Sequence, residues 1–232
     1  MVSLGMARKS SPSDHGDAMM RMAIERCGAD AARRVREALR SGASLGMGSG
    51  WPRSPLMTAA NRGRVEAMRA LLEAGAEVDE ANGEGETALM CAANDLTCDA
   101  LRLLVSKGAL LDLRDKEGWT AARWAAVHFN ARGIALRGEA GADMDAPDEV
   151  GDSPLVGCAE RGDVAVIQAL LGAGADVEFR GADGKRAIEL AVGGGRSEAA
   201  ALLRDFELAA RERRELAEAS SNAAPALRKS AL

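Results

Sequence analysis

Residues 153–176 read SPLVGCAERGDVAVIQALLGAGAD, and this stretch decides the architecture because the chain repeats its pattern. The Gly-Ala pair near its end recurs at a constant interval, at Gly42-Ala43, Gly75-Ala76, Gly108-Ala109, Gly141-Ala142 and Gly174-Ala175. The residue that opens the stretch keeps the same step, at Ser54, Thr87, Thr120, Ser153 and Arg186. A constant step over this many copies indicates tandem copies of one structural unit.

Each copy predicts two short helices joined by a turn. The Ser or Thr can accept a hydrogen bond at the start of the first helix, and Pro55 and Pro154 sit where a missing N–H costs nothing. Apolar residues at helical spacing follow, and the glycine of each Gly-Ala pair stands where the second helix must stop in a left-handed conformation. About ten residues, which we call a finger, then lead to the next copy.

This interval, together with a T-P-L-like start and a G-A-D-like end, resembles the ankyrin repeat, whose period is about 33 residues. The resemblance implies an all-α fold, an α-solenoid of about six helix-turn-helix repeats with degenerate terminal caps. It also implies that the fingers project as β-hairpin-like loops. Such a fold does not by itself fix a function.

The repeats set the predicted boundaries. We expect a disordered leader at 1–16, a repeat domain at 17–206, an extended C-terminal helix at 207–219 and a disordered tail at 220–232. The first helix should follow Asp17, and Asp30 should cap the second. The repeats are predicted at 17–48, 49–81, 82–114, 115–147, 148–180 and 181–206.

The second helix of repeat four looks weak. It contains Gly133 and Gly138, and each interior glycine costs roughly 1 kcal/mol relative to alanine. Arg137 replaces a leucine of the other repeats, and Phe129 fills the turn position of Gly63 and Gly162. We expect this helix to open before its counterpart in repeat five.

Composition narrows the classes of function. The net charge of −5 argues against non-specific binding to nucleic acid, which needs basic side chains to neutralise phosphates. No apolar run has the length of a signal peptide or a membrane span, so we expect no membrane association. We expect the protein to be located in the cytoplasm, and the nucleus is the alternative location. The four cysteines form no C-x-x-C pair and are expected to be free thiols.

No residue set predicts catalysis. The two histidines are His15 and His128, and neither forms a recognisable set with a nucleophile. Cys91 and Cys158 occupy positions of small core residues, where a free cysteine acts as a small hydrophobe. We therefore expect no enzyme activity, no catalytic or cofactor-binding residues, no cofactor, no metal and no small-molecule substrate.

Acidic residues crowd three fingers, and this set leaves two interpretations open, a solvated surface or a strip that attracts a basic partner. Trp51 and Trp119 flank fingers and could pack beneath them or serve as exposed anchors, whereas Trp124 is expected in the core. The finger acids are Asp79, Glu80, Glu84, Glu86, Asp112, Asp115, Glu117, Asp145, Asp148, Glu149 and Asp152.

The resemblance implies a protein–protein interaction module, a scaffold, adaptor or inhibitor whose partner is another protein with a basic segment. The alternatives are a regulatory subunit and a fragment of a larger multidomain protein. Ankyrin-like repeats grip partners with finger tips and the exposed face of the first helices. Carried onto this chain, those positions are Trp51, Arg53, Asn61, Glu84, Glu86, Asn94, Asp95, Lys116, Glu117, Trp119, Val127, His128, Glu149, Asp152, Glu160 and Arg161.

Overall fold

The computed structural model describes residues 12–25, 30–47 and 51–229, and the chain divides into two compact units, residues 1–142 and 143–232. The predictions for residues 1–11, Cys27 and residues 230–232 lie outside the described residues.

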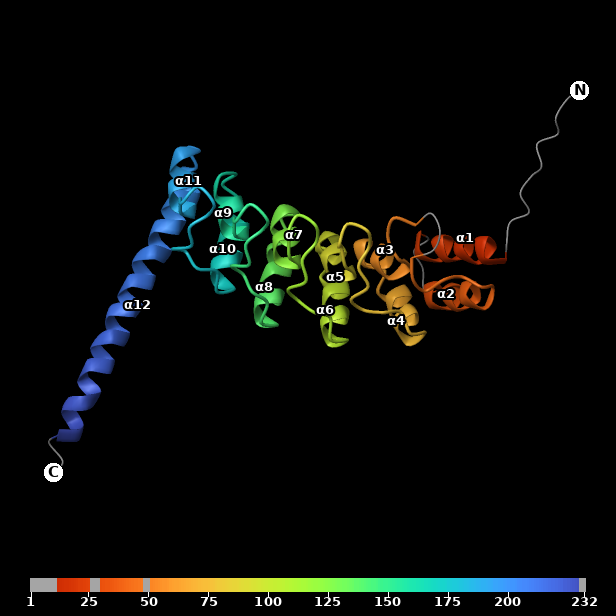
Figure 1. Ribbon diagram of the computed structural model, residues 1–232, viewed down its shortest axis with the longest axis horizontal. Coiled ribbons are helices and arrows are strands. Elements are labelled where there is room, and N and C mark those ends of the chain that lie inside the picture. The colour runs from red at the N-terminus through yellow and green to blue at the C-terminus, as the bar shows by residue number, and fades with distance from the viewer. Residues whose placement is uncertain (1–11, 26–29, 48–50, 230–232) are drawn as a thin grey trace, which may run out of the picture. The chain divides into compact units, whose positions relative to one another are not determined.

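The first unit is built from helix pairs that follow one another in chain order (Figure 1). The predicted all-α repeat architecture is confirmed. Its helices are α1 (Pro12–Glu25), α2 (Ala31–Arg40), α3 (Pro55–Asn61), α4 (Val65–Glu73), α5 (Ala88–Cys91) with a 3₁₀ turn (Ala92–Asn94), α6 (Asp99–Ser106), α7 (Ala121–Val127) and α8 (Ala131–Glu139).

The first helices of the pairs form an inner row, and the second helices form an outer row. In the inner row α1 contacts α3, α3 contacts α5, and α5 contacts α7, whereas in the outer row α2 contacts α4, and α4 contacts α6. Alanine, leucine and methionine dominate the buried side chains. Small side chains allow thin helical layers to stack closely, so each repeat buries its apolar faces mainly against its neighbours.

The predicted helix starts and stops are confirmed. The hydroxyl oxygens of Ser54, Thr87, Thr120 and Ser153 each accept a hydrogen bond from the backbone N–H three residues later. Gly75, Gly108, Gly141 and Gly174 all have positive φ, between 81° and 100°. Asp30 precedes α2 as expected, but its carboxylate makes no cap hydrogen bond and pairs with Arg33.

The predicted hairpin-like fingers are present as loops without regular strands. Among the described residues the only β-bridge joins Arg180 to Arg186, and no strand forms. Each finger instead closes as a tight turn, as where the Gly85 N–H donates to the Asn82 carbonyl and the Asn82 N–H to the Glu86 carbonyl. Side-chain oxygens supply acceptors inside the turn, so the backbone does not need a strand ladder.

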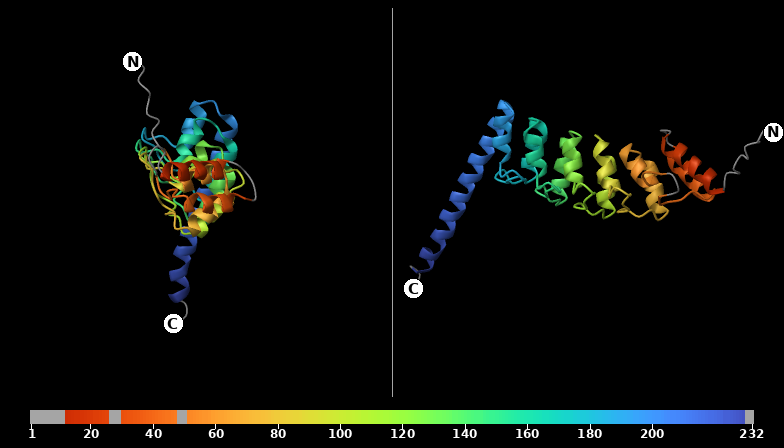
Figure 2. Two further views of the ribbon diagram at one scale, coloured as in Figure 1. Left: turned by 90° about the vertical axis from the view of Figure 1, so that its right-hand side faces the viewer. Right: turned by 45° about the horizontal axis from the view of Figure 1, so that its top comes forward.

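The second unit contains α9 (Pro154–Ala159), α10 (Val164–Gly172), α11 (Ala187–Gly193) and α12 (Ser197–Lys229). Within this unit α12 extends well beyond the other helices (Figure 2). The sequence predicted that the last helix would continue past residue 207, where Glu207 replaces the expected glycine. In the structure Glu207 forms an ion pair, with its Oε1 2.9 Å from Nη1 of Arg186. Arg186 stands where the other repeats have the helix-opening Ser or Thr.

Two terminal boundaries differ from the predictions. α1 begins at Pro12 rather than after Asp17, so residues 12–16 of the expected leader are helical. α12 ends at Lys229, so residues 220–229 of the expected tail are helical too. Proline is compatible with a first helical turn, which allows α1 to begin at Pro12. The end of α12 is helical despite Pro225.

Candidate functional site

The candidate site is the surface formed in the first unit by the inner helices α3, α5 and α7 and the fingers that precede them. Neighbouring fingers are joined by hydrogen bonds: the Leu110 N–H donates to the Asp79 carboxylate at 3.0 Å, and the Lys116 N–H donates to the Glu84 carbonyl at 2.9 Å. These bonds hold equivalent residues of successive repeats in register. The surface therefore presents rows of side chains that lie one repeat apart in the sequence.

One finger acid and one finger amide serve the turns rather than the surface. The Asp115 carboxylate is buried and accepts the backbone N–H groups of Glu117 and Trp119 at 3.1 and 2.8 Å. Asn82 does the same for Glu84 and Glu86. These side chains stabilise the tips, so the negative charge available to a partner is smaller than the sequence indicates.

An ion pair joins the second and third repeats. The Arg53 guanidinium donates two hydrogen bonds of 2.9 Å to the Glu86 carboxylate, which also accepts from the Asn82 amide at 2.8 Å. These hydrogen bonds lower the pKa of Glu86, and the Glu86 carboxylate raises the pKa of Arg53. The structure brings the predicted site residues Arg53 and Glu86 together, but each is already the hydrogen-bond partner of the other.

Exposed charges lie at the tips of two neighbouring fingers, the finger that contains Glu86 and the finger that follows it. Lys116 Nζ is 3.5 Å from Glu84 Oε1, and both side chains are more than 60% exposed. Glu117 is also exposed. Solvent screens such pairs, so Glu84 and Glu117 are available to a cation from a partner at little cost.

An aromatic cluster distinguishes the fourth repeat. The rings of Trp119 and Trp124 meet edge to face with centroids 5.8 Å apart, and the Trp124 ring stacks on the His128 ring at 5.6 Å. The Arg123 guanidinium lies 5.4 Å from the centroid of the Trp119 ring. All three rings are half-buried, and burial lowers the pKa of His128, so the imidazole is neutral at pH 7.

The prediction that Trp124 belongs to the core holds in part, because its ring packs against the core cluster but stays half-buried. Its indole N–H donates to the Asp115 carboxylate at 2.7 Å, which fixes the ring at the edge of the inner face. A buried partner for the indole nitrogen is what a partly exposed tryptophan requires. The sequence carried the signal in the nine-residue spacing from Asp115 to Trp124, but only the fold brings these positions together.

Asn61, Asn94 and Val127 continue the same face one repeat apart. The Asn94 amide donates to the Asn61 side-chain oxygen, and Val127 is half-buried. This row carries no charge.

Two predicted site residues are corrected. Trp51 is only 9% exposed, and the Arg21 guanidinium covers its ring at 4.6 Å, so it packs beneath the finger. Asp95 is 7% exposed, and its carboxylate accepts the backbone N–H groups of Thr97 and Ala100 at 3.0 Å. Both side chains are structural because their polar or aromatic surfaces are already used.

The remaining predicted site residues lie in the second unit. Asp152 accepts the backbone N–H of Ala182 at 3.0 Å, and Arg161 pairs with Asp163 at 2.8 Å. Glu149 and Glu160 are exposed. Of these four side chains, the two glutamates present exposed carboxylates.

The described residues do not bring together three His, Cys, Asp or Glu side chains that could hold a metal ion. Cys91, Cys98 and Cys158 are buried free thiols, and burial raises the pKa of Cys91 to about 12. A thiol of that pKa is not a nucleophile at neutral pH.

None of the helices in the part of the chain that the structure describes combines the length and apolarity needed to cross a lipid bilayer.

Comparison with protein families agrees with the fold. The family described as "Ankyrin repeats (3 copies)" matches residues 19–115 and 56–137, which together cover just over half of the chain. The chain belongs to the ankyrin-repeat family. Members of this family are generally protein–protein interaction modules, and the fold is typically non-catalytic. No curated protein matches the chain.

Proposed function

We propose that this protein is an interaction module, a scaffold, adaptor or inhibitor without catalytic activity, which binds a partner protein on the inner face of its first unit. The observation that carries the proposal is the cluster of Trp119, Trp124 and His128. Asp115 fixes the Trp124 ring, and the half-buried rings of Trp119 and His128 pack on it, so little conformational entropy is lost when a partner covers them. Tryptophan is enriched among the residues that dominate binding energy at interfaces.

The contacting segment of the partner is proposed to be basic. Glu84 and Glu117 stand at adjacent finger tips, and their exposed carboxylates can attract a lysine or arginine beside the aromatic cluster. Charges of this kind mainly accelerate association, whereas buried aromatic contacts mainly slow dissociation.

The test is proximity labelling with the full chain, followed by binding kinetics on the partner that is recovered. Trp119→Ala and Trp124→Phe should each raise the dissociation rate by roughly tenfold or more, as expected of an anchor. Leu96→Ala removes a side chain that is 68% exposed outside the cluster and should leave the rate unchanged. If the tryptophan variants fold and bind as the wild type does, the inner face is not the interface.

The charge proposal has its own readout. Glu84→Lys with Glu117→Lys should slow association, and so should raising salt from about 50 to about 500 mM, because the Debye length then shortens to a few ångströms. An association rate that is insensitive to both changes would show that the partner is not basic.

The regulatory-subunit alternative would place the partner on α12, where Leu208 and Leu216 are 53% and 71% exposed. Leu208→Glu with Leu216→Glu distinguishes the two proposals. Loss of binding in this variant, with normal binding in Trp119→Ala, would favour α12.

A further inference from the structure

The outer helices of the first unit carry an arginine at the same repeat position. Arg36 lies in α2, Arg69 in α4 and Arg102 in α6, each one repeat after the last. The outer helix of the next repeat ends at a position that is also equivalent from repeat to repeat. Glu73 ends α4, Ser106 ends α6 and Glu139 ends α8. One of the three endings therefore has a hydroxyl where the other two have a carboxylate.

At the first of these positions the arginine pairs with the glutamate of the next repeat. Arg36 Nη2 of α2 lies 3.2 Å from Glu73 Oε2 of α4, an ion pair between neighbouring repeats. The equivalent partner of Arg69 is Ser106, whose hydroxyl donates to the Leu103 carbonyl at 2.7 Å. Arg69 has Glu66 of its own helix at 3.8 Å, and both of these side chains are more than half exposed. The gap between α4 and α6 thus lacks the carboxylate that bridges α2 and α4.

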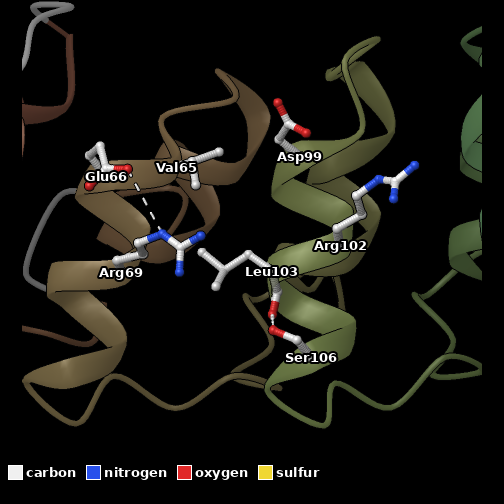
Figure 3. A pocket seen from close by; sticks show the side chains of 7 residues that line it. All are labelled: Val65, Glu66, Arg69, Asp99, Arg102, Leu103 and Ser106. Atoms are coloured by element: carbon white, nitrogen blue, oxygen red, sulfur yellow. Dashed lines mark hydrogen bonds and ion pairs between the residues drawn. The ribbon is translucent and has the colours of Figure 1, made fainter.

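A groove of about 520 Å³ lies at this place, lined by Val65, Glu66, Arg69, Asp99, Arg102, Leu103 and Ser106. In Figure 3 the Arg69 side chain reaches from α4 toward α6, and Leu103 points back toward it, whereas Arg102 points away from α4. Leu103 is 5% exposed and Val65 is half-buried, so they form an apolar floor.

The two carboxylates of the groove lie apart from Ser106. Glu66 and Asp99 belong to the first turns of α4 and α6, and Ser106 is at the opposite end of the groove (Figure 3). The groove therefore has an acidic end at Glu66 and Asp99, and the Arg69 head group and Leu103 lie between that end and Ser106 (Figure 3). The Arg69 guanidinium suits a carboxylate, which accepts its hydrogen bonds, whereas the hydroxyl hydrogen of Ser106 is already donated to the Leu103 carbonyl. Ser106 therefore contributes space, because it is smaller than the glutamate that ends α4 and α8.

We propose that this outer groove binds an acidic segment of a partner protein. A glutamate or aspartate of the segment takes the place that Glu73 takes beside Arg36. It is bonded to Arg69 in the space that the small Ser106 side chain leaves, and a neighbouring apolar side chain covers Val65 and Leu103. This surface is separate from the inner face described above and is formed by the outer helices. The partner chemistry is the opposite of the basic segment proposed for the finger tips.

The test is differential selection of a random-peptide library on the full chain and on its Ser106→Glu variant. A glutamate at 106 should pair with Arg69 as Glu73 pairs with Arg36, which fills the site without loss of stability. Peptides retained by the wild type and lost on the variant should be enriched in glutamate or aspartate near an apolar residue. Each should bind at least about fivefold more weakly to Arg69→Ala, the effect of losing about one ion pair.

Ser106→Ala is the matched control, because it removes the hydroxyl without adding charge and should retain most of the binding. Replacing the acid of a selected peptide by its amide should weaken binding to the wild type but not further weaken binding to Arg69→Ala. The proposal is overturned if no peptides distinguish the wild type from Ser106→Glu, or if those that do are not acidic. It is also overturned if Arg69→Ala, with an unchanged melting temperature, binds them as tightly as the wild type.

Discussion

Helices α6 and α8 occupy equivalent places in successive repeats of the first unit, but different interactions hold them. The buried side chains of α6 are alanines and leucines. The buried residues of α8 are Gly133, Ile134 and Arg137, and Arg137 stands one repeat after Leu104. Apolar burial holds α6, whereas α8 depends on a buried cation and an amide.

Arg137 is fully buried without a carboxylate partner among the described residues. Its two terminal nitrogens donate to the carbonyls of Gly133 and Leu89, each at 3.1 Å. Burial lowers the pKa of Arg137 to about 10, so the guanidinium is still charged at pH 7. Desolvation of a charge is only partly offset by bonds to neutral carbonyls, so this residue ties α8 to α5 at a cost in stability.

Asn130 and Gly133 complete the arrangement. The Asn130 side chain accepts the Gly133 N–H at 2.8 Å and donates to the carbonyls of Ala93 and Asp95 at 3.0 and 3.2 Å. A Cβ atom at position 133 would lie 2.8 Å from Cγ of Asn130 and 2.9 Å from Nη1 of Arg137. The glycine that looked like a weakness in the sequence is required by its neighbours.

The largest effect is expected from Asn130→Ala. The change removes the cap of α8 and leaves two buried carbonyls without this donor, which should lower the free energy of unfolding by about 3 kcal/mol. Thr97→Ala at the equivalent position before α6 changes an exposed side chain and should cost less than about 1 kcal/mol. Urea denaturation of the two variants measures the difference, and equal losses would mean that the two helices are held alike.

Gly133→Ala should lower the free energy of unfolding by about 2 kcal/mol, because the new methyl group overlaps side chains that are fixed by hydrogen bonds. Helix propensity alone predicts the opposite sign, a gain of up to about 1 kcal/mol. The loss should be smaller in an Arg137→Leu background, where one of the two overlapping groups is absent. A gain in stability in the single variant would show that the site relaxes easily.

Arg137→Leu gives α8 the residue that α6 has at this position. We expect the free energy of unfolding to rise by about 1 kcal/mol, since a buried cation is replaced by an apolar side chain while the Leu89 carbonyl loses a donor. Thermal unfolding measures the shift, with Arg137→Ala as the control that should lose stability by leaving a cavity. A less stable leucine variant would mean that the guanidinium bonds outweigh its desolvation.

The smallest effect concerns the turn before α8. Phe129 has a φ of 57° and is 60% exposed, in a conformation that costs a non-glycine residue about 1 kcal/mol. Phe129→Gly should recover about that amount. In the third repeat the left-handed residue is Cys98, with φ of 64°, rather than Leu96 at the equivalent position, so Leu96→Gly should bring no gain. Equal responses at the two positions would contradict this assignment.

The early opening of α8 relative to α10 remains a prediction, and hydrogen exchange of the two helices can measure it. The variants above show why the sequence could not settle the matter. Gly133 and Arg137 are individually unfavourable in a helix, but their joint effect depends on groups from α5 and from the turn after it, tens of residues earlier in the chain.

The sequence by itself determined the repeat, its period, the helix-opening hydroxyls and the helix-ending glycines. These features are local: a hydroxyl caps the turn that it begins, and a glycine tolerates positive φ wherever it stands. Apolar spacing then identifies the buried faces, because helical periodicity is a property of the segment alone. This was enough to predict the fold, whereas the inner face was selected as the candidate site because the resemblance to the ankyrin repeat implied it.

Only the tertiary structure decided which side chains of that site face a partner. Trp51 packs beneath its finger, Trp124 lies at the edge of the inner face, and Asp95 and Asp115 are buried in turns. In each case the deciding contact comes from another element, such as Arg21 on Trp51 or the Asp115 carboxylate on Trp124. Burial and hydrogen-bond satisfaction depend on such distant partners, and no local pattern encodes them.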